Sequence, residues 1–225
     1  VIEYLYNSIS EILKNNNIEY VKWDMNRSIS DWYSGLLPSN RQGEQPHRYV
    51  LGLYELLERL TTEFPHILFE GCSGGGGRFD AGMLYYCPQI WCSDDTDAHE
   101  RTFIQYGTSF FYPISTVGSH VSAVPNHQTG RITSLDTRGI VAMAGSFGYE
   151  LDLSTLTEEE KETMKEQVKK YREYQLLIHD GDYYRLTNPH KERIAAWQWQ
   201  DKNNGNVLVH GVVFRAIPNM LRDKV

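Results

Sequence analysis

The sequence predicts an α/β fold with parallel strands, followed by a small antiparallel β region. Five short apolar runs alternate with segments of helical period, which is the pattern of repeated strand–helix units. After about residue 184 the pattern changes to alternating apolar and polar residues around the turn "NNG" at 203–205, as in a hairpin. Five strand–helix units fit either a closed barrel or a doubly wound open sheet.

The first half of the chain predicts two helices and two strands. Residues 1–14 carry apolar side chains at helical spacing and are followed by three asparagines that end the helix. Residues 18–24 form a short apolar run typical of a strand. Residues 47–64 repeat the helical spacing as far as Pro65, which cannot continue a helix. Residues 66–72 form the second strand and lead into a glycine-rich loop.

The second half predicts three more strands and three more helices. The strands are predicted at residues 89–95, 114–122 and 147–154, and the helices at residues 97–111, 135–145 and 157–181. The last helix has the clearest ends, because Thr157 and Glu160 form a capping box and Gly181 stops the helix. We place the parallel region at residues 1–184 and the start of the antiparallel region at residues 185–225.

The composition argues against several classes of protein. The net charge of −7 disfavours nucleic-acid binding, which needs a surplus of Lys and Arg. No apolar run reaches the ~18 residues of a membrane span. Cys72, Cys87 and Cys92 lack the spacing of a metal finger and predict reduced thiols, so no metal or other cofactor is expected. The fifteen tyrosines and five tryptophans suit a core, and also a hydroxyl-bearing ligand such as a sugar.

The chain begins inside a helical pattern. Its first residues lack the basic segment and the small-residue cleavage site of a signal peptide. We therefore expect the chain to be part of a longer protein.

Three predicted strands end in polar or reactive side chains: Asp24, Cys72 and Asp94. Ligands of parallel α/β folds bind at the carboxyl ends of the strands, so we expect these side chains to lie near one another. A lone aspartate at a strand end most simply caps the next turn. Lys22 changes that interpretation, because it points to the same side as Asp24 and would favour the ionised carboxylate that a nucleophile needs.

The segment "WCSDDTDAHER" (91–101) provides a second acid. Asp97 leads directly into a predicted helix and suits an N-cap. Asp94 lies nearer the apolar, aromatic strand, whose surroundings favour the protonated carboxyl of a general acid. Two carboxyl groups whose pKa values are shifted in opposite directions are typical of glycoside hydrolysis.

The segment "EGCSGGGGRFD" (70–80) lacks the ending of a phosphate-binding loop. A loop whose backbone closely approaches a ligand is the favoured interpretation, since glycine allows that approach. A nucleophilic role of Cys72 remains an alternative. Because no base lies nearby in the sequence, we favour a place for Cys72 in the wall of a pocket. We interpret His120, His127 and Arg131 as structural, with ligand contact as the alternative.

Together these motifs resemble those of the bacterial α-galactosidases of the melibiase and raffinose-cleaving type, glycoside hydrolase family 36. The resemblance is carried, in matching order and spacing, by "KWDMNR" (22–27), "FEGCSGGGGRFD" (69–80), "WCSDDTDAHER" (91–101) and "VGSHVSAVPNHQTGR" (117–131). It implies a (β/α)8 TIM barrel, of which this chain would hold about strands 4–8, and then the start of an antiparallel β-sandwich domain.

The resemblance also implies a retaining mechanism with a covalent glycosyl-enzyme. Carried over by position, Asp24 is the nucleophile and Asp94 the general acid/base. Retention requires these two carboxyl groups to lie ~5–5.5 Å apart. The implied substrate-binding residues are Lys22, Cys72, Gly74 and Trp91, with Cys72 and Gly74 against the galactose 2-hydroxyl.

The implied substrate is an α-galactoside such as melibiose or raffinose, with no nucleic-acid or membrane partner. The resemblance further implies a homo-oligomeric full-length enzyme in the bacterial cytoplasm. A non-catalytic sugar-binding or assembly fragment, an α-N-acetylgalactosaminidase and an α-galactosyl transglycosidase stay open as alternatives. Because the earlier barrel strands would be missing, we expect little or no activity from the isolated 225-residue chain.

Overall fold

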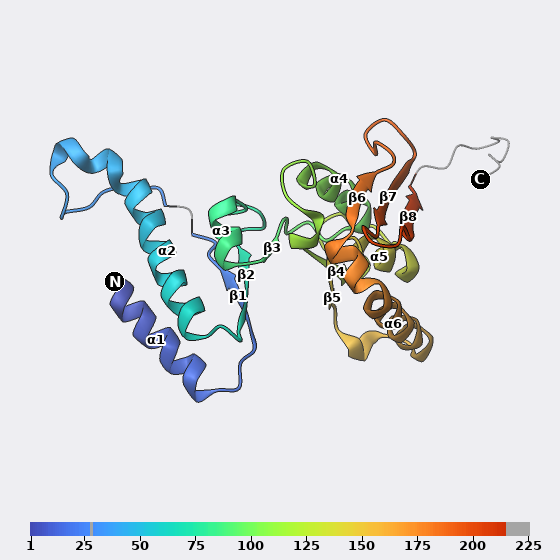
Figure 1. Cartoon of the computed structure of the whole chain (residues 1–225), viewed down its shortest axis with the longest axis horizontal. Coiled ribbons are helices and arrows are strands. Elements are labelled where there is room, and N and C mark those ends of the chain that lie inside the picture. Colours follow the sequence, from blue (N-terminus) through green and yellow to red (C-terminus); the bar gives the residue numbers. More distant parts are fainter. Residues whose placement is uncertain (28, 215–225) are drawn as a thin grey trace. The chain divides into compact units, whose positions relative to one another are not determined.

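The computed structural model describes residues 1–27 and 29–214, which belong to two compact units (Figure 1). The first unit is Val1–Trp91, and the second begins at Cys92. Residues 215–225 of the predicted antiparallel region lie outside the described residues. None of the helices in the described part of the chain has the length and apolar character needed to cross a lipid bilayer.

The first unit alternates helices with parallel strands. Its helices are α1 (Ile2–Asn15), the 3-10 helix η1 (Ser39–Glu44), α2 (Gln45–Glu63) and α3 (Ala81–Tyr86). Its strands are β1 (Tyr20–Asp24), β2 (Leu68–Cys72) and β3 (Gln89–Trp91). Strand β2 lies between β1 and β3, and its register places Glu70 beside Lys22 and Cys72 beside Asp24.

The two faces of these strands differ because successive side chains alternate in direction. Val21, Trp23 and Phe69 pack into the apolar core that the strands share with α1 and α2. Helix α2 contributes a buried stripe at helical spacing, made of Leu53, Leu56, Leu57 and Leu60. Lys22 and Glu70 therefore point to the opposite face of the sheet, together with the strand-end residues Asp24 and Cys72.

The second unit contains parallel and antiparallel strands. Its helices are α4 (Ala98–Thr108), η2 (Ile114–Thr116), α5 (Leu135–Ala142), η3 (Leu153–Thr155) and α6 (Glu158–Asp180). Its strands are β4 (Val117–Ser122), β5 (Ser146–Glu150), β6 (Asp182–Arg185), β7 (Ile194–Gln200) and β8 (Val207–Val213). Strands β4 and β5 are parallel, and β6, β7 and β8 form an antiparallel sheet in that order.

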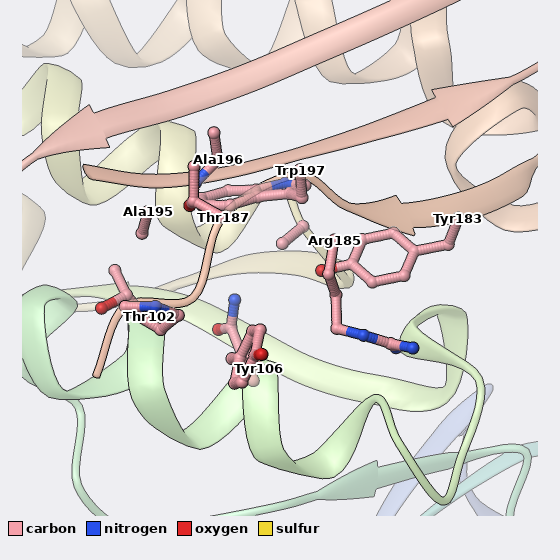
Figure 2. Close-up of a pocket in the computed structure, with 11 residues that line it drawn as sticks. Thr102, Tyr106, Tyr183, Arg185, Thr187, Ala195, Ala196 and Trp197 are labelled. Atoms are coloured by element: carbon pink, nitrogen blue, oxygen red, sulfur yellow. The ribbon is translucent and has the colours of Figure 1, made fainter. Parts of the chain in front are cut away.

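Helix α4 packs closely against the antiparallel sheet. Thr102 and Tyr106 of α4 face Arg185 of β6 and Trp197 of β7 across a cavity of only about 10 Å³ (Figure 2). The guanidinium of Arg185 lies 4.0 Å from the ring centroid of Phe110, and its Nη1 donates to the Ser109 carbonyl at 3.0 Å. A cavity of this size is too small for a ligand, so this contact is structural.

Most elements lie where the sequence predicts them. Thr157 and Glu160 form both hydrogen bonds of the predicted capping box, and Gly181 follows the last helix. Helix α3 and strand β6 are absent from the sequence prediction because both are short and lack a clear period. The predicted strand at 114–122 begins with a 3-10 turn, so its extended part starts only at Val117.

The prediction of a strand over residues 89–95 is wrong beyond Trp91. The backbone N–H of Asp95 is bonded to the Ser93 hydroxyl, and that of Asp97 to the Asp95 carboxylate. Such side-chain-to-backbone turns bend the chain away from a strand. Asp94 therefore lies in a loop and is exposed, three residues beyond the end of β3.

Candidate active site

The ends of β1 and β2 bring Asp24 and Cys72 together. These residues are register partners, and the Met25 N–H continues the pairing with a 3.1 Å hydrogen bond to the Cys72 carbonyl. The Asp24 side chain is exposed, whereas Cys72 is 6% exposed. The Asp24 carboxylate is close enough to the Cys72 thiol to contribute to the raised pKa of that thiol. The sequence prediction that these strand ends meet is thus confirmed within the first unit.

Asn26 links Asp24 to the glycine-rich loop. Its side-chain Nδ2 donates to Asp24 Oδ2 at 2.9 Å, and its Oδ1 accepts from the Gly74 N–H at 2.5 Å. Gly74 has a φ of 51°, in the left-handed region that glycine adopts without strain. Sequence reasoning assigned no role to Asn26. Its place two residues after a strand-end aspartate was the available signal, but the partner loop lies 48 residues away.

The loop is further anchored by Ser73 and Arg78. The Ser73 hydroxyl donates to the Met25 carbonyl at 2.8 Å, and Arg78 Nη1 donates to the same oxygen at 2.6 Å. A Cβ atom on Gly77 would lie 2.6 Å from the Ser73 carbonyl oxygen, so the loop has no room for a side chain there. These contacts hold the backbone of the loop next to the end of β1.

Lys22 lies between an aromatic ring and a buried acid. Its Nζ is 4.7 Å from the centroid of the Trp91 ring and 3.8 Å from Glu70 Oε1. Trp91 is 3% exposed, and it presents its ring face to the cation, an arrangement that attracts an ammonium through the negative face of the ring. Lys22, Asp24, Cys72, Gly74 and Trp91 thus all belong to the first unit, and Asp94 belongs to the second.

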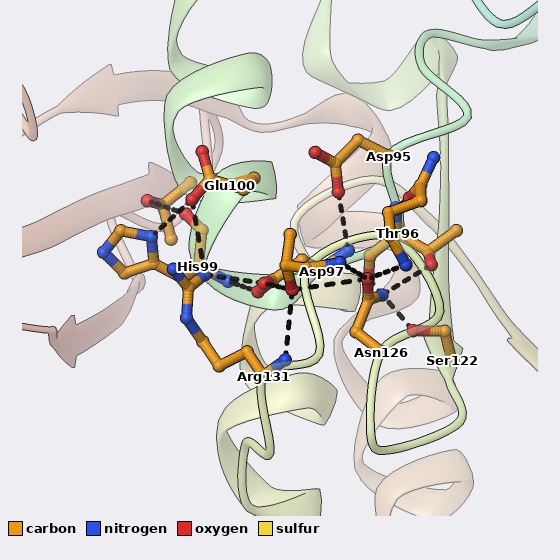
Figure 3. A network of polar contacts seen from close by, with 11 residues as sticks. Asp95, Thr96, Asp97, His99, Glu100, Ser122, Asn126 and Arg131 are labelled. Atoms are coloured by element: carbon orange, nitrogen blue, oxygen red, sulfur yellow. Dashed lines mark hydrogen bonds and ion pairs between the residues drawn. The ribbon is translucent and has the colours of Figure 1, made fainter.

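The residues that follow Asp94 in its loop, Asp95, Thr96 and Asp97, are held by several hydrogen bonds and an ion pair (Figure 3). Asp97 caps α4 by accepting from the His99 N–H at 2.8 Å, and it also accepts from the Thr129 hydroxyl and from Arg131 Nη1 at 2.6 Å. Burial alone would raise the pKa of Asp97, but these hydrogen bonds outweigh it and lower the pKa. The N-cap interpretation of Asp97 is therefore confirmed, and Arg131 has a structural role.

The other side of the same loop is held by Thr96. Its N–H donates to Gln128 Oε1 at 3.1 Å, its hydroxyl accepts from Asn126 Nδ2 at 3.0 Å, and its carbonyl accepts from the Ser122 hydroxyl at 3.0 Å. Asn126 and Gln128 follow β4, and their segment therefore supports the loop that carries Asp94 (Figure 3). Sequence reasoning missed this support, since each contact joins segments about 30 residues apart.

Within residues 1–27 and 29–214, no group of three or more His, Cys, Asp or Glu side chains is placed to hold a metal ion. The candidate site of the first unit consists of the Asp24 and Glu70 carboxylates, a lysine, a thiol and backbone N–H groups. These groups can bind hydroxyls, transfer protons and attack an electrophilic carbon.

The Cys72 thiol is expected to resist alkylation at neutral pH. Burial raises its pKa to about 11, and the neighbouring Asp24 carboxylate acts in the same direction. The thiolate is the reactive form, so at pH 7.5 iodoacetamide should modify Cys72 more than about 100-fold slower than unfolded cysteine, whose pKa is ~8.5. The rate should rise with pH up to about pH 11, as followed by mass spectrometry of the Cys72 peptide.

The urea-unfolded protein provides the control for this labelling. Burial also raises the pKa of Cys87, to about 12, and that of Cys92. All three thiols should therefore react together only after unfolding. Rapid labelling of Cys72 in the folded protein would contradict the pocket-wall interpretation and would revive Cys72 as a nucleophile.

Comparison with known proteins supports one family. The Melibiase family model matches residues 1–181. The chain is 56% identical over 209 residues to α-galactosidase AgaA of Geobacillus stearothermophilus, covering 93% of this chain and 29% of that protein. It is 54% identical over 219 residues to the bifunctional α-galactosidase/sucrose kinase AgaSK of Mediterraneibacter gnavus, covering 97% of this chain and 23% of that protein.

Solved structures agree with this result. A crystal structure of an AgaA variant from Geobacillus stearothermophilus in complex with raffinose, a glycoside hydrolase family 36 α-galactosidase, superposes with a TM-score of 0.95 at 53% identity. The match covers 98% of this chain and 31% of that one. The chain thus spans less than a third of the length of these relatives. Its parallel strands and antiparallel sheet fit part of a TIM barrel and part of a β-sandwich.

Proposed function

The chain belongs to the Melibiase family, and on that basis we propose that it is part of an α-galactosidase that removes terminal α-galactosyl residues from oligosaccharides such as melibiose and raffinose. The observation that carries the proposal is the identity above 50% to named α-galactosidases over more than nine tenths of this chain. The activity belongs to the longer protein, since the match covers less than a third of each relative.

The proposed reaction is a double displacement. Asp24 attacks the anomeric carbon while Asp94 gives its proton to the glycosidic oxygen, so the leaving sugar departs and a galactosyl ester forms on Asp24. Asp94, now ionised, takes a proton from water, and the resulting hydroxide attacks the anomeric carbon. Cleavage of the ester releases galactose with its α configuration retained and restores both carboxyl groups.

Three complexes of AgaA support these two roles. The complexes with raffinose and with stachyose were each obtained with a variant that lacks one aspartate, and the two replaced aspartates lie 70 positions apart. The complex with 1-deoxygalactonojirimycin retains both aspartates. A bound substrate remains uncleaved when a side chain needed for its cleavage has been replaced, which is consistent with a catalytic role for each of these aspartates. Asp24 and Asp94 are also 70 positions apart, which favours Asp94 over Asp95 as the acid.

The surroundings of Asp24 suit a nucleophile. Asn26 Nδ2 donates to its carboxylate, which restrains the orientation of the carboxylate at the end of β1. Lys22 lies on the same face of the strand and can bond a sugar hydroxyl. Cys72 and Gly74 lie on the 2-hydroxyl side in this proposal, where an acetamido group in place of the hydroxyl would collide with the loop.

Family membership extends the proposal to the rest of the molecule. We assign the five parallel strands to positions 4–8 of the barrel and the antiparallel sheet to the start of a β-sandwich domain. We further propose that the full-length enzyme is a cytoplasmic homo-oligomer.

The test is turnover by the full-length enzyme. With p-nitrophenyl α-galactoside we expect rates in the usual range of ~1–10³ s⁻¹, and proton NMR should show α-galactose before it mutarotates. Early appearance of β-galactose would overturn the retaining mechanism. Faster cleavage of the α-N-acetylgalactosaminide, or galactosyl transfer to sucrose as the main reaction, would replace the proposal by one of the open alternatives. Galactose binding without turnover would indicate a non-catalytic protein.

A further inference from the structure

Glu70 is a buried acid at the candidate site that the proposed mechanism leaves unused. It is 1% exposed, although it lies on the strand face that carries Lys22 and Asp24 rather than in the apolar core. Its register partners are Lys22 on β1 and Gln89 on β3. A carboxylate in such a place is costly unless its charge and its oxygens have partners.

The two oxygens of Glu70 have different surroundings. Oε2 accepts from the Tyr20 hydroxyl and from Gln89 Nε2, the latter at 3.1 Å. Burial, together with the hydrogen bond to Glu70, raises the pKa of Tyr20, so this hydroxyl stays protonated and donates. Oε1 is buried and accepts no hydrogen bond from any described residue, and it faces Lys22 Nζ at 3.8 Å. Glu70 thus has two donors on one oxygen and the Lys22 ammonium opposite the other.

The geometry of the Lys22 contact is that of an ion pair and not of a hydrogen bond. At 3.8 Å, Glu70 attracts the ammonium without occupying one of its three N–H donors. The Trp91 ring lies 4.7 Å from the same nitrogen and confines it from another side. The N–H donors of Lys22 therefore remain available to bind oxygens of a ligand. The contacts with Glu70 and Trp91 restrict the position of its nitrogen. The Lys22 side chain is 36% exposed and that of Glu70 is 2% exposed, so the pair extends from the interior to the surface of the site.

We propose that Glu70 is the positioning residue for Lys22: held by Tyr20 and Gln89, its buried carboxylate keeps the ammonium against Trp91, where it can bond a galactose hydroxyl. This inference rests on the proposed function. Glu70 touches neither the sugar nor the reacting atoms in this arrangement, and it acts only through the position of Lys22.

The first unit contains a matched control. Glu63, the last residue of α2, also accepts from a tyrosine hydroxyl, that of Tyr6, and pairs with a lysine, since Lys14 Nζ lies 2.5 Å from its Oε1. Its partners are on α1, on the helical side of the sheet. Glu63→Gln therefore removes the same kind of contact without affecting Lys22.

The test is a double-mutant cycle in the full-length enzyme with Glu70→Gln and Lys22→Met. Glu70→Gln should lower kcat/KM for p-nitrophenyl α-galactoside by ~10–100-fold and weaken inhibition by galactose, because a charged partner of Lys22 is lost. In the Lys22→Met background the same change should cost less than about twofold, since the two residues act as one unit. Tyr20→Phe should give a smaller loss, about threefold, that also disappears in that background.

Several outcomes would overturn the inference. Equal losses from Glu70→Gln with and without Lys22 would show that Glu70 acts independently, and a loss no greater than that of Glu63→Gln would show a general effect on folding. If Glu70→Gln does not fold, the cycle of Tyr20→Phe with Lys22→Met provides the same test. Equal losses from Tyr20→Phe with and without Lys22 would then overturn the inference. Wild-type kinetics of Lys22→Met would end this inference while the proposed function stands. A wild-type enzyme without turnover would end the proposed function itself.

Discussion

Replacing Asp24 by asparagine is expected to abolish galactoside hydrolysis while galactose binding survives. The amide cannot form the galactosyl ester, so the first displacement has no nucleophile, and kcat should fall on the order of 10⁴-fold or more. Asparagine has the same shape, and Asn26 and Lys22 still surround it. The measurement is steady-state turnover of p-nitrophenyl α-galactoside by the full-length variant, with calorimetric titration of galactose.

Asp31→Asn is the matched control for this experiment. Asp31 is an exposed aspartate seven residues further along the chain, outside β1 and outside the contacts of the candidate site. The control variant should keep wild-type turnover and binding. Turnover of Asp24→Asn within about tenfold of the wild type would remove Asp24 from the role of nucleophile, because loss of an essential nucleophile costs far more.

Replacing Asp94 by asparagine is expected to produce a loss that depends on the leaving group. Sucrose is a poor leaving group and needs its oxygen protonated, so hydrolysis of raffinose should fall by ~10²–10⁴-fold, the usual contribution of a general acid. p-Nitrophenolate departs without a proton, so formation of the galactosyl ester from the aryl galactoside should be affected much less. Pre-steady-state release of p-nitrophenol, compared with raffinose turnover, measures the difference.

Asp95→Asn separates this effect from a distorted loop. Asp95 Oδ1 accepts from the Asp97 N–H at 3.0 Å, so its replacement disturbs the same loop beside the N-cap of α4. A loop disturbance should lower the rates with both substrates by a similar factor. If Asp95→Asn instead shows the dependence on the leaving group and Asp94→Asn does not, the general acid is the neighbouring residue.

The helices and strands were largely predictable because their signals are local. The capping box of Thr157 and Glu160 joins residues three positions apart, and the buried leucines of α2 recur within one helix. Such patterns contain most of the interactions that form the element. The predicted strand at 89–95 was longer than β3 because apolar residues continue to Cys92. The turn at Ser93 and Asp95 depends on side-chain hydrogen bonds, which a hydropathy pattern does not reveal.

The sequence by itself determined which strand ends bear reactive groups, since Lys22 and Asp24 share a face by the two-residue period of a strand. Only the tertiary structure decided which groups surround them. Glu70 reaches Lys22 through the register of two strands whose residues are about 50 positions apart, and Asn26 reaches Gly74 across 48 positions. Local periodicity does not specify a register between distant segments. Packing of the apolar faces sets that register, and with it the position of each polar side chain on the opposite face.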